Sequence, residues 1–154
     1  MIQMKHYLFK IGVIWMVTLR LGMADQPTDA DLRQMVTDIS IDKAGEGIAL
    51  ALKEDKPEIL VYAMKHPKWT VKTKALEAIG KLTPREAAKA FTAILNQNEL
   101  WTRSMSGRKA AVQNDFAETL KNEIYTACST DIKTYDLFND KDRAKAAKFL
   151  EKFN

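Results

Sequence analysis

The segment Pro57–Met64 constrains the fold more than any other stretch, because it is apolar around almost its whole circumference when wound into a helix. Its apolar positions are Ile59, Leu60, Val61, Tyr62, Ala63 and Met64. A helix without a polar face must be covered on two sides. Pro57 suits the first helical turn, Asp55 is the expected N-cap, and Pro67 disfavours helical backbone just before it. The sequence therefore predicts a short helix enclosed by neighbouring helices.

A second, amphipathic helix is predicted immediately after the His66–Pro67 corner. Its apolar stripe has helical spacing and comprises Val71, Ala75, Ala78, Ile79 and Leu82. The run Pro67–Gly80 combines a proline corner, a Val followed by a basic residue, and then closely spaced Ala and Leu. It resembles the second helix of HEAT-type α-solenoid repeats. The resemblance implies an all-α fold, a short right-handed stack of antiparallel helix pairs forming a HEAT-like α-α superhelix that presents a surface to a partner.

The rest of the chain predicts further helices and no strand. Thr28 is the expected N-cap of a helix whose inward residues are Leu32, Met35, Val36 and Ile39. Thr83, Pro84 and Glu86 predict a capping box at the start of another helix. We expect six or seven helices in total, paired as residues 28–53, 57–82 and 84–127 and followed by a terminal cap.

The last predicted helix, Asp140–Phe153, is amphipathic. Its inward residues are expected to be Ala146, Phe149, Leu150 and Phe153. Its basic residues lie elsewhere on the helix and are Lys141, Arg143, Lys145, Lys148 and Lys152. A basic amphipathic helix can lie on a membrane. Three acidic residues dilute the charge of this one, which favours docking as the terminal cap of the stack.

Residues 1–24 are expected to be a secretory signal peptide that is cut after Ala24. A basic start precedes the apolar run Ile11–Leu19, and small residues lie before the proposed cut. Lys10 and Arg20 interrupt this pattern, so an uncleaved membrane anchor and a buried first helix remain as alternatives. The expected location is periplasmic or extracellular, or membrane-anchored through residues 1–24.

The positive charge of the chain is concentrated in this predicted leader. The full chain has 24 Lys and Arg against 20 Asp and Glu, a net charge of +4. Residues 1–24 contain Lys5, Lys10 and Arg20 and no acid, so residues 25–154, the predicted helical repeat-like domain, carry 21 against 20, a net charge of +1. A nucleic-acid partner therefore loses its main compositional support.

Side chains that could perform catalysis are few. Beyond residue 24 the chain has one histidine, His66, and one cysteine, Cys128. A hydrolase would have to combine His66 with a serine of the 96–107 connection, and no metal-ligand spacing accompanies it. Cys128 is expected to be a buried structural thiol. Gly45 and Gly47 are expected to allow close helix packing, because no strand precedes them and no phosphate-loop Lys follows. The sequence predicts no enzyme, cofactor or metal site.

Two sets of basic and aromatic residues are the candidate binding residues. The first lies at the predicted corner and comprises Lys68, Trp69 and Lys72. The second lies in and after the 96–107 connection and comprises Trp101, Arg103, Arg108 and Lys109. Trp and Arg are enriched at binding hot spots, and we expect both sets at one edge of the stack, facing an acidic protein surface. The alternative is that the two Trp residues belong to the core and are flanked by solvated Lys.

The first functional hypothesis is therefore an exported, non-catalytic helical module that binds a protein partner. A narrower form of it is a small inhibitor or immunity-type protein of the cell envelope. The second hypothesis is a structural protein associated with a membrane surface through residues 1–24 or the last helix. The third is a hydrolase built on His66.

Overall fold

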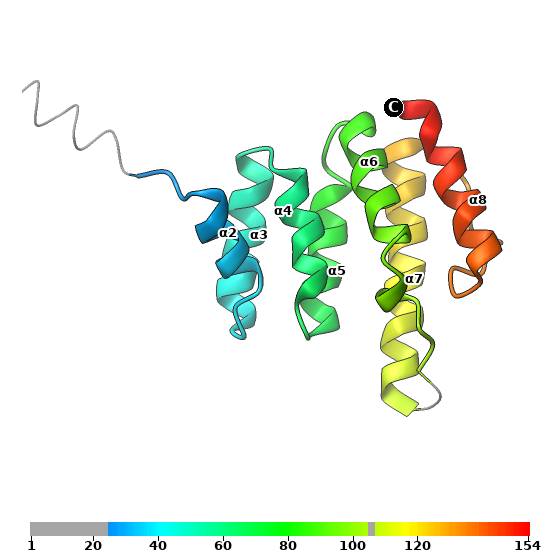
Figure 1. Ribbon diagram of the computed structural model, residues 1–154, viewed down its shortest axis with the longest axis horizontal. Helices are drawn as coiled ribbons and strands as arrows, with labels where there is room; N and C mark the ends of the chain where they lie inside the picture. The colour runs from blue at the N-terminus through cyan, green and yellow to red at the C-terminus, as the bar shows by residue number, and fades with distance from the viewer. Residues whose placement is uncertain (1–24, 105–106) are drawn as a thin grey trace, which may run out of the picture.

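The computed structural model describes residues 25–104 and 107–154, so the predicted leader lies outside the described residues. The described part of the chain is all-helical, with seven α-helices and no strand (Figure 1). The α-helices are α2 (Asp29–Val36), α3 (Ile41–Lys53), α4 (Pro57–Tyr62), α5 (Trp69–Ile79), α6 (Pro84–Leu95), α7 (Gly107–Cys128) and α8 (Asp140–Leu150). Three 3-10 turns accompany them: η1 (Ala63–Lys65), η2 (Asn98–Leu100) and η3 (Glu151–Phe153). The prediction of an all-α chain with six or seven helices is confirmed for these residues.

The helices lie side by side in two rows. α2, α4, α6 and α8 each contact the next member of that series, and α3, α5 and α7 do the same in a second series. Within each pair of consecutive helices from α2 to α7 the chain runs up one helix and down the other (Figure 1). All seven helices contribute residues to one apolar core. Each helix therefore buries one side against its own partner and another against the neighbouring pair.

The segment before the proline corner forms α4 and the turn η1. Ile59, Leu60, Ala63 and Met64 are buried, while Val61 and Tyr62 are half-buried. α4 contacts α2, α3, α5 and α6, which accounts for its nearly complete apolar surface. The helix ends as predicted: His66 adopts extended backbone with ψ 138°, as the residue before a proline does.

Several helix starts follow the predicted capping chemistry. The Thr28 and Asp31 side chains form a capping box at α2, and the Thr83 hydroxyl accepts from the Glu86 N–H at α6. The expected cap at Asp55 is wrong. The residue before α4 is Lys56, which makes no side-chain cap bond, and Asp55 lies in the left-handed region with φ 55°.

Two residues expected to face inward are exposed instead. Ile39 belongs to the corner between α2 and α3 and is 78% exposed, and Phe149 on α8 is 49% exposed. α2 ends at Val36, before Ile39, so the helical spacing that predicted its burial does not extend that far. One residue expected on the solvated side, Arg143, is buried.

Gly47 allows α3 to approach α2 closely, whereas Gly45 does not. A Cβ atom at Gly47 would lie 2.7 Å from the Met35 Cβ and 3.0 Å from the Val36 backbone nitrogen. A Cβ at Gly45 would meet only the end of the Lys74 side chain, at 3.8 Å. The expectation of close packing is therefore confirmed for Gly47 alone.

Candidate functional site

Four aromatic rings connect the proline corner to the connections on either side of α7. Trp69 at the start of α5 packs edge-on against Phe116 of α7, with ring centroids 5.1 Å apart. Trp101 lies 5.8 Å from Phe116, and Phe138 lies 5.9 Å from Trp101. We call these four residues the aromatic row. The two predicted tryptophans thus meet on a common ring, which places the two candidate sets near each other.

The two tryptophans differ in access to solvent. Trp101 is 3% exposed and its Nε1–H donates to the Ile94 carbonyl at 3.1 Å. Trp101 is a core residue, so its side chain is not available to a partner. This agrees with the alternative interpretation that the tryptophan belongs to the core. Trp69 is half-buried. Its ring is therefore the one predicted aromatic contact that a partner can reach directly.

Two cations of the first set surround Trp69. Lys72 lies one turn further along α5, with its Nζ 4.2 Å from the centre of the Trp69 ring, a cation–π geometry. Burial lowers the pKa of the Lys72 ammonium, and the nearby Glu99 carboxylate opposes that shift. Lys68 precedes α5 and is exposed. The corner therefore presents an aromatic face bordered by two positive charges.

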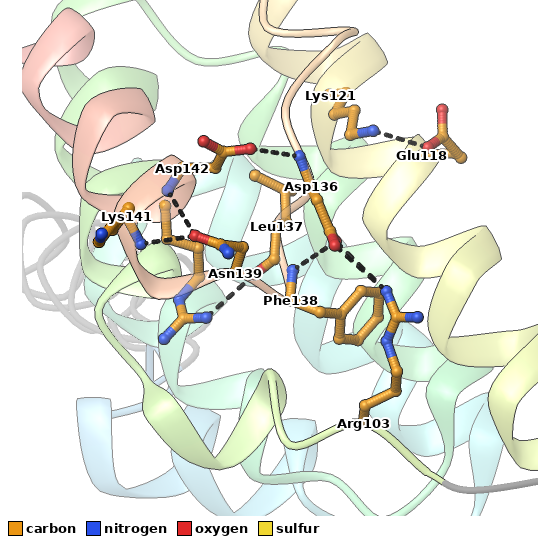
Figure 2. Close-up of polar contacts among 10 residues, drawn as sticks. Arg103, Glu118, Lys121, Asp136, Leu137, Phe138, Asn139, Lys141 and Asp142 are labelled. Carbon is orange, nitrogen blue, oxygen red and sulfur yellow. Dashed lines mark hydrogen bonds and ion pairs between the residues drawn. The ribbon is translucent and has the colours of Figure 1, made fainter.

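Arg103 of the second set is already engaged within the protein. Its guanidinium lies over the Phe138 ring at 4.9 Å, and its Nη2 is 3.3 Å from an Asp136 carboxylate oxygen. Asp136 also accepts from the Phe138 N–H, while its own N–H donates to Asp142, as Figure 2 shows. Arg103 thereby ties its connection to the segment before α8, while its side chain remains 63% exposed.

Arg108 and Lys109 lie in the first turn of α7 and are exposed. They lie about 12 Å along the helix axis from Phe116 at the usual rise per residue. The first turns of α7 and the corner before α5 lie at the same end of the molecule (Figure 1). The Gln113 side chain fixes the connection there, accepting from the Ser104 N–H at 2.8 Å and donating to the Thr102 carbonyl at 2.9 Å.

The candidate surface therefore lacks one predicted residue, the buried Trp101. We call it the basic edge: Lys68, Trp69, Lys72, Arg103, Arg108 and Lys109. Within the described ranges, no ion pair involves Lys68, Arg108 or Lys109. These three residues supply most of its accessible positive charge.

The acidic neighbours of the basic edge are residues that sequence reasoning missed. The Glu99 carboxylate acts to raise the pKa of Lys72, and Asp136 pairs with Arg103. Neither pair has the i,i+4 spacing by which a helical ion pair can be predicted from sequence. Phe116 is different. It belongs to an apolar series that recurs every four residues along the sequence of α7, but that series cannot tell which residues of another helix it meets.

His66 has both ring nitrogens occupied by main-chain groups. It is fully buried; its Nε2–H donates to the Asp38 carbonyl at 2.7 Å, and its Nδ1 accepts from the Lys68 N–H at 2.9 Å. These two bonds require the tautomer with hydrogen on Nε2. In this arrangement neither nitrogen can act as a general base toward a substrate. The ring instead joins the α2–α3 corner to the α4–α5 corner.

The other reactive groups also have structural surroundings. Cys128 is buried, burial raises the pKa of its thiol, and its Sγ lies 3.7 Å from the Pro84 carbonyl. Residues 25–104 and 107–154 contain no cluster of three His, Cys, Asp or Glu side chains that could hold a metal ion. No helix in these same ranges combines the length and apolarity that crossing a bilayer requires.

Comparison with known proteins adds no relative to this picture. No protein-family model, curated protein or solved structure matches the chain.

Proposed function

We propose that the protein is a non-catalytic helical module that binds a protein partner, and that its helix pairs form a short right-handed HEAT-like stack. The two series of contacting helices support the stack, because the main contacts between helix pairs in the described ranges join neighbouring pairs. The His66 side chain supports it further, since it joins consecutive corners through main-chain bonds. α8 covers the last pair and acts as the terminal cap.

The basic edge is the proposed contact surface for the partner. The observation that carries this proposal is the half-buried Trp69 ring, which is held from one side by Phe116 and from another by the Lys72 ammonium. A preordered aromatic ring loses little side-chain freedom on binding, and cations beside it select an acidic surface. The net charge of +1 for residues 25–154 favours a protein partner over nucleic acid.

Export is part of the same proposal. It rests on residues 1–24, and it places the partner in the periplasm or outside the cell. Determining the N-terminus of the purified natural protein tests this part separately. A start at Asp25 supports export and cleavage, whereas a start at Met1 or Met4 supports a membrane-anchored, structural role.

The binding surface is tested by affinity capture from an envelope extract, with captured proteins quantified by mass spectrometry. Two variants remove features of the basic edge: Trp69→Ala, and the double variant Arg108→Glu with Lys109→Glu. Each is expected to lower recovery of the partner by about tenfold, the loss typical of a hot-spot residue.

The matched control reverses the same number of charges elsewhere. Arg85 and Lys89 are exposed residues in the first turns of α6, so the double variant Arg85→Glu with Lys89→Glu has an equal change in net charge near a helix start. Recovery should remain at the wild-type level for this control. Equal losses for the two double variants would show that net charge, and not the basic edge, governs capture.

A further inference from the structure

The outer side of α8 carries a groove distinct from the basic edge. Its volume is about 420 Å³ and it is lined by Tyr135, Lys145, Lys148 and Phe149. The Tyr135 and Phe149 rings are 6.2 Å apart and tilted by 30°. Ligand sites commonly have volumes of about 300–1,000 Å³. The groove is thus large enough for one or two side chains of a partner.

Phe149 is exposed because the apolar side of α8 is already used. Ala146 and Leu150 are fully buried, and α8 packs on α6. Phe149 projects to the other side, where half of its surface remains in water. A large aromatic residue left exposed beside a second ring forms an apolar contact point that the fold itself does not cover.

The charge around the groove is positive. Lys141, Lys145 and Lys148 follow one another at intervals of four and three residues, which places them along one side of α8, and Lys152 follows in η3. Two of the nearby acids are directed to the protein's own groups: Asp140 pairs with the buried Arg143, and Asp142 accepts from the Asp136 N–H. Lys145 lies 3.7 Å from Asp142, and within the described ranges no ion pair involves Lys148.

We propose that this groove binds an acidic peptide segment carrying one aromatic or branched apolar side chain. The apolar side chain would pack in the groove against the Tyr135 and Phe149 rings that line it, and carboxylates on either side of it would pair with Lys145 and Lys148. The inference concerns a different surface from the basic edge and does not depend on the proposed function.

An anionic membrane is the competing ligand for a row of lysines, and the structure favours the peptide. A helix that lies on a membrane inserts a continuous apolar face. On α8 that face is buried in the protein, with Ala146 and Leu150 both 0% exposed. Phe149 alone would enter the lipid. A groove lined by two rings and two lysines instead has the size of one or two side chains of a peptide.

Fluorescence anisotropy with the full chain and two labelled peptides tests the proposal. The probe is Asp-Glu-Phe-Glu-Asp and its control is Asp-Glu-Ser-Glu-Asp. The first peptide should bind with a micromolar to millimolar dissociation constant, and the second about tenfold more weakly because it lacks the anchor. Phe149→Ala should weaken binding of the first peptide about tenfold and leave that of the second unchanged.

The contribution of charge is tested by Lys145→Gln with Lys148→Gln, against Lys53→Gln with Lys89→Gln at exposed sites elsewhere. Only the first pair should weaken binding and reduce its dependence on salt. Amide chemical-shift mapping with the unmodified chain, which needs no variant, should show the largest changes around Tyr135 and Phe149.

Three results would overturn the proposal: equal binding of the two peptides, no binding of either at millimolar concentration, or shift changes located away from the groove. Sedimentation with phosphatidylserine–phosphatidylcholine vesicles provides the fourth. Vesicle binding that Phe149→Ala abolishes, without peptide binding, would assign the groove to membranes.

Discussion

His66 and Arg143 each connect one part of the helix array to another, and they do so with different chemistry. His66 is an uncharged ring, fully enclosed, with one bond to each of two corners. Arg143 is a charged group at the terminal helix, 7% exposed, that donates to the Leu137 carbonyl, the Asn98 side chain and the Asp140 carboxylate. The connection made by His66 avoids the desolvation of a charge, whereas the connection made by Arg143 keeps its charge next to the exposed Asp140 carboxylate.

Removing Arg143 is expected to produce the largest loss of stability. Arg143→Ala leaves the Leu137 carbonyl without its donor and removes the guanidinium that lies over the Trp101 ring. The free energy of unfolding should fall by about 3 kcal/mol, measured by urea denaturation. Arg143→Met keeps most of the aliphatic packing and should recover part of the loss. Full recovery by Met would mean that packing and not hydrogen bonding makes this joint.

Removing His66 should cost somewhat less. His66→Ala opens a small cavity and leaves the Asp38 carbonyl and the Lys68 N–H without their shared partner. A loss of about 2 kcal/mol is expected. Hydrogen exchange provides the specific readout, because amides of α2 and α3 should lose protection before those of α7 and α8. Uniform loss along the chain would contradict a role limited to the two corners.

The two glycines of α3 provide a smaller test within one helix. Gly47→Ala forces α3 away from the α2 backbone and should lower the free energy of unfolding by about 1–2 kcal/mol. Gly45→Ala meets no such obstacle and should raise it by about 0.5–1 kcal/mol through helix propensity. Thermal unfolding of both variants measures the difference. The same sign for both would show that the close approach at Gly47 relaxes without cost.

The smallest expected effects concern pH, and carboxyl groups near α2 and on α7 should respond in opposite directions. The Thr28 side chain lowers the pKa of Asp31, and the Ser40 N–H lowers that of Asp38. A carboxylate with a lowered pKa stabilises the fold above its unfolded-state value and loses that contribution as pH falls. Asp38→Asn should therefore reduce stability at neutral pH and change little well below the ordinary value of 3.8, measured by denaturation across this range.

Glu123 on α7 should show the reverse dependence. Burial raises the pKa of its carboxyl, Glu77 adds to the shift and Lys81 opposes it. A raised pKa contributes stability that is present in acid and lost as pH rises beyond the ordinary value of 4.5. Glu123→Gln should slightly stabilise the protein at neutral pH and have no effect in acid. Destabilisation at neutral pH would show that the carboxylate makes a favourable contact instead.

The sequence predicted elements that depend on neighbouring residues. Capping at Thr28 and Thr83 and the corner at Pro67 follow from contacts within a few residues. The buried state of Arg143 did not follow. Its helical position placed it among the solvated lysines, and two of its three acceptors lie outside α8: the Leu137 carbonyl and the side chain of Asn98, 45 residues away.

The candidate surface was predicted only where it depends on residues close together in the sequence. Composition identified Trp69 and Lys72, which lie one helical turn apart and meet through local geometry. It could not separate the buried Trp101 from the accessible Trp69, because both are tryptophans beside basic residues. Phe116 contacts both rings, so their difference arises from the Ile94 carbonyl and the Phe138 ring, which only the folded chain brings to Trp101.

The His66 ring bonds only to main-chain groups, the Asp38 carbonyl and the Lys68 N–H. The bond to residue 68 therefore does not depend on the side chain at that position. Lys68 can therefore be exchanged for almost any other amino acid that keeps a main-chain N–H, and His66 still joins the two corners. A change of charge beside Trp69 would then alter what docks there and leave the architecture as it was. Recognition at this position can diverge from one variant to the next without disturbing the fold that carries it.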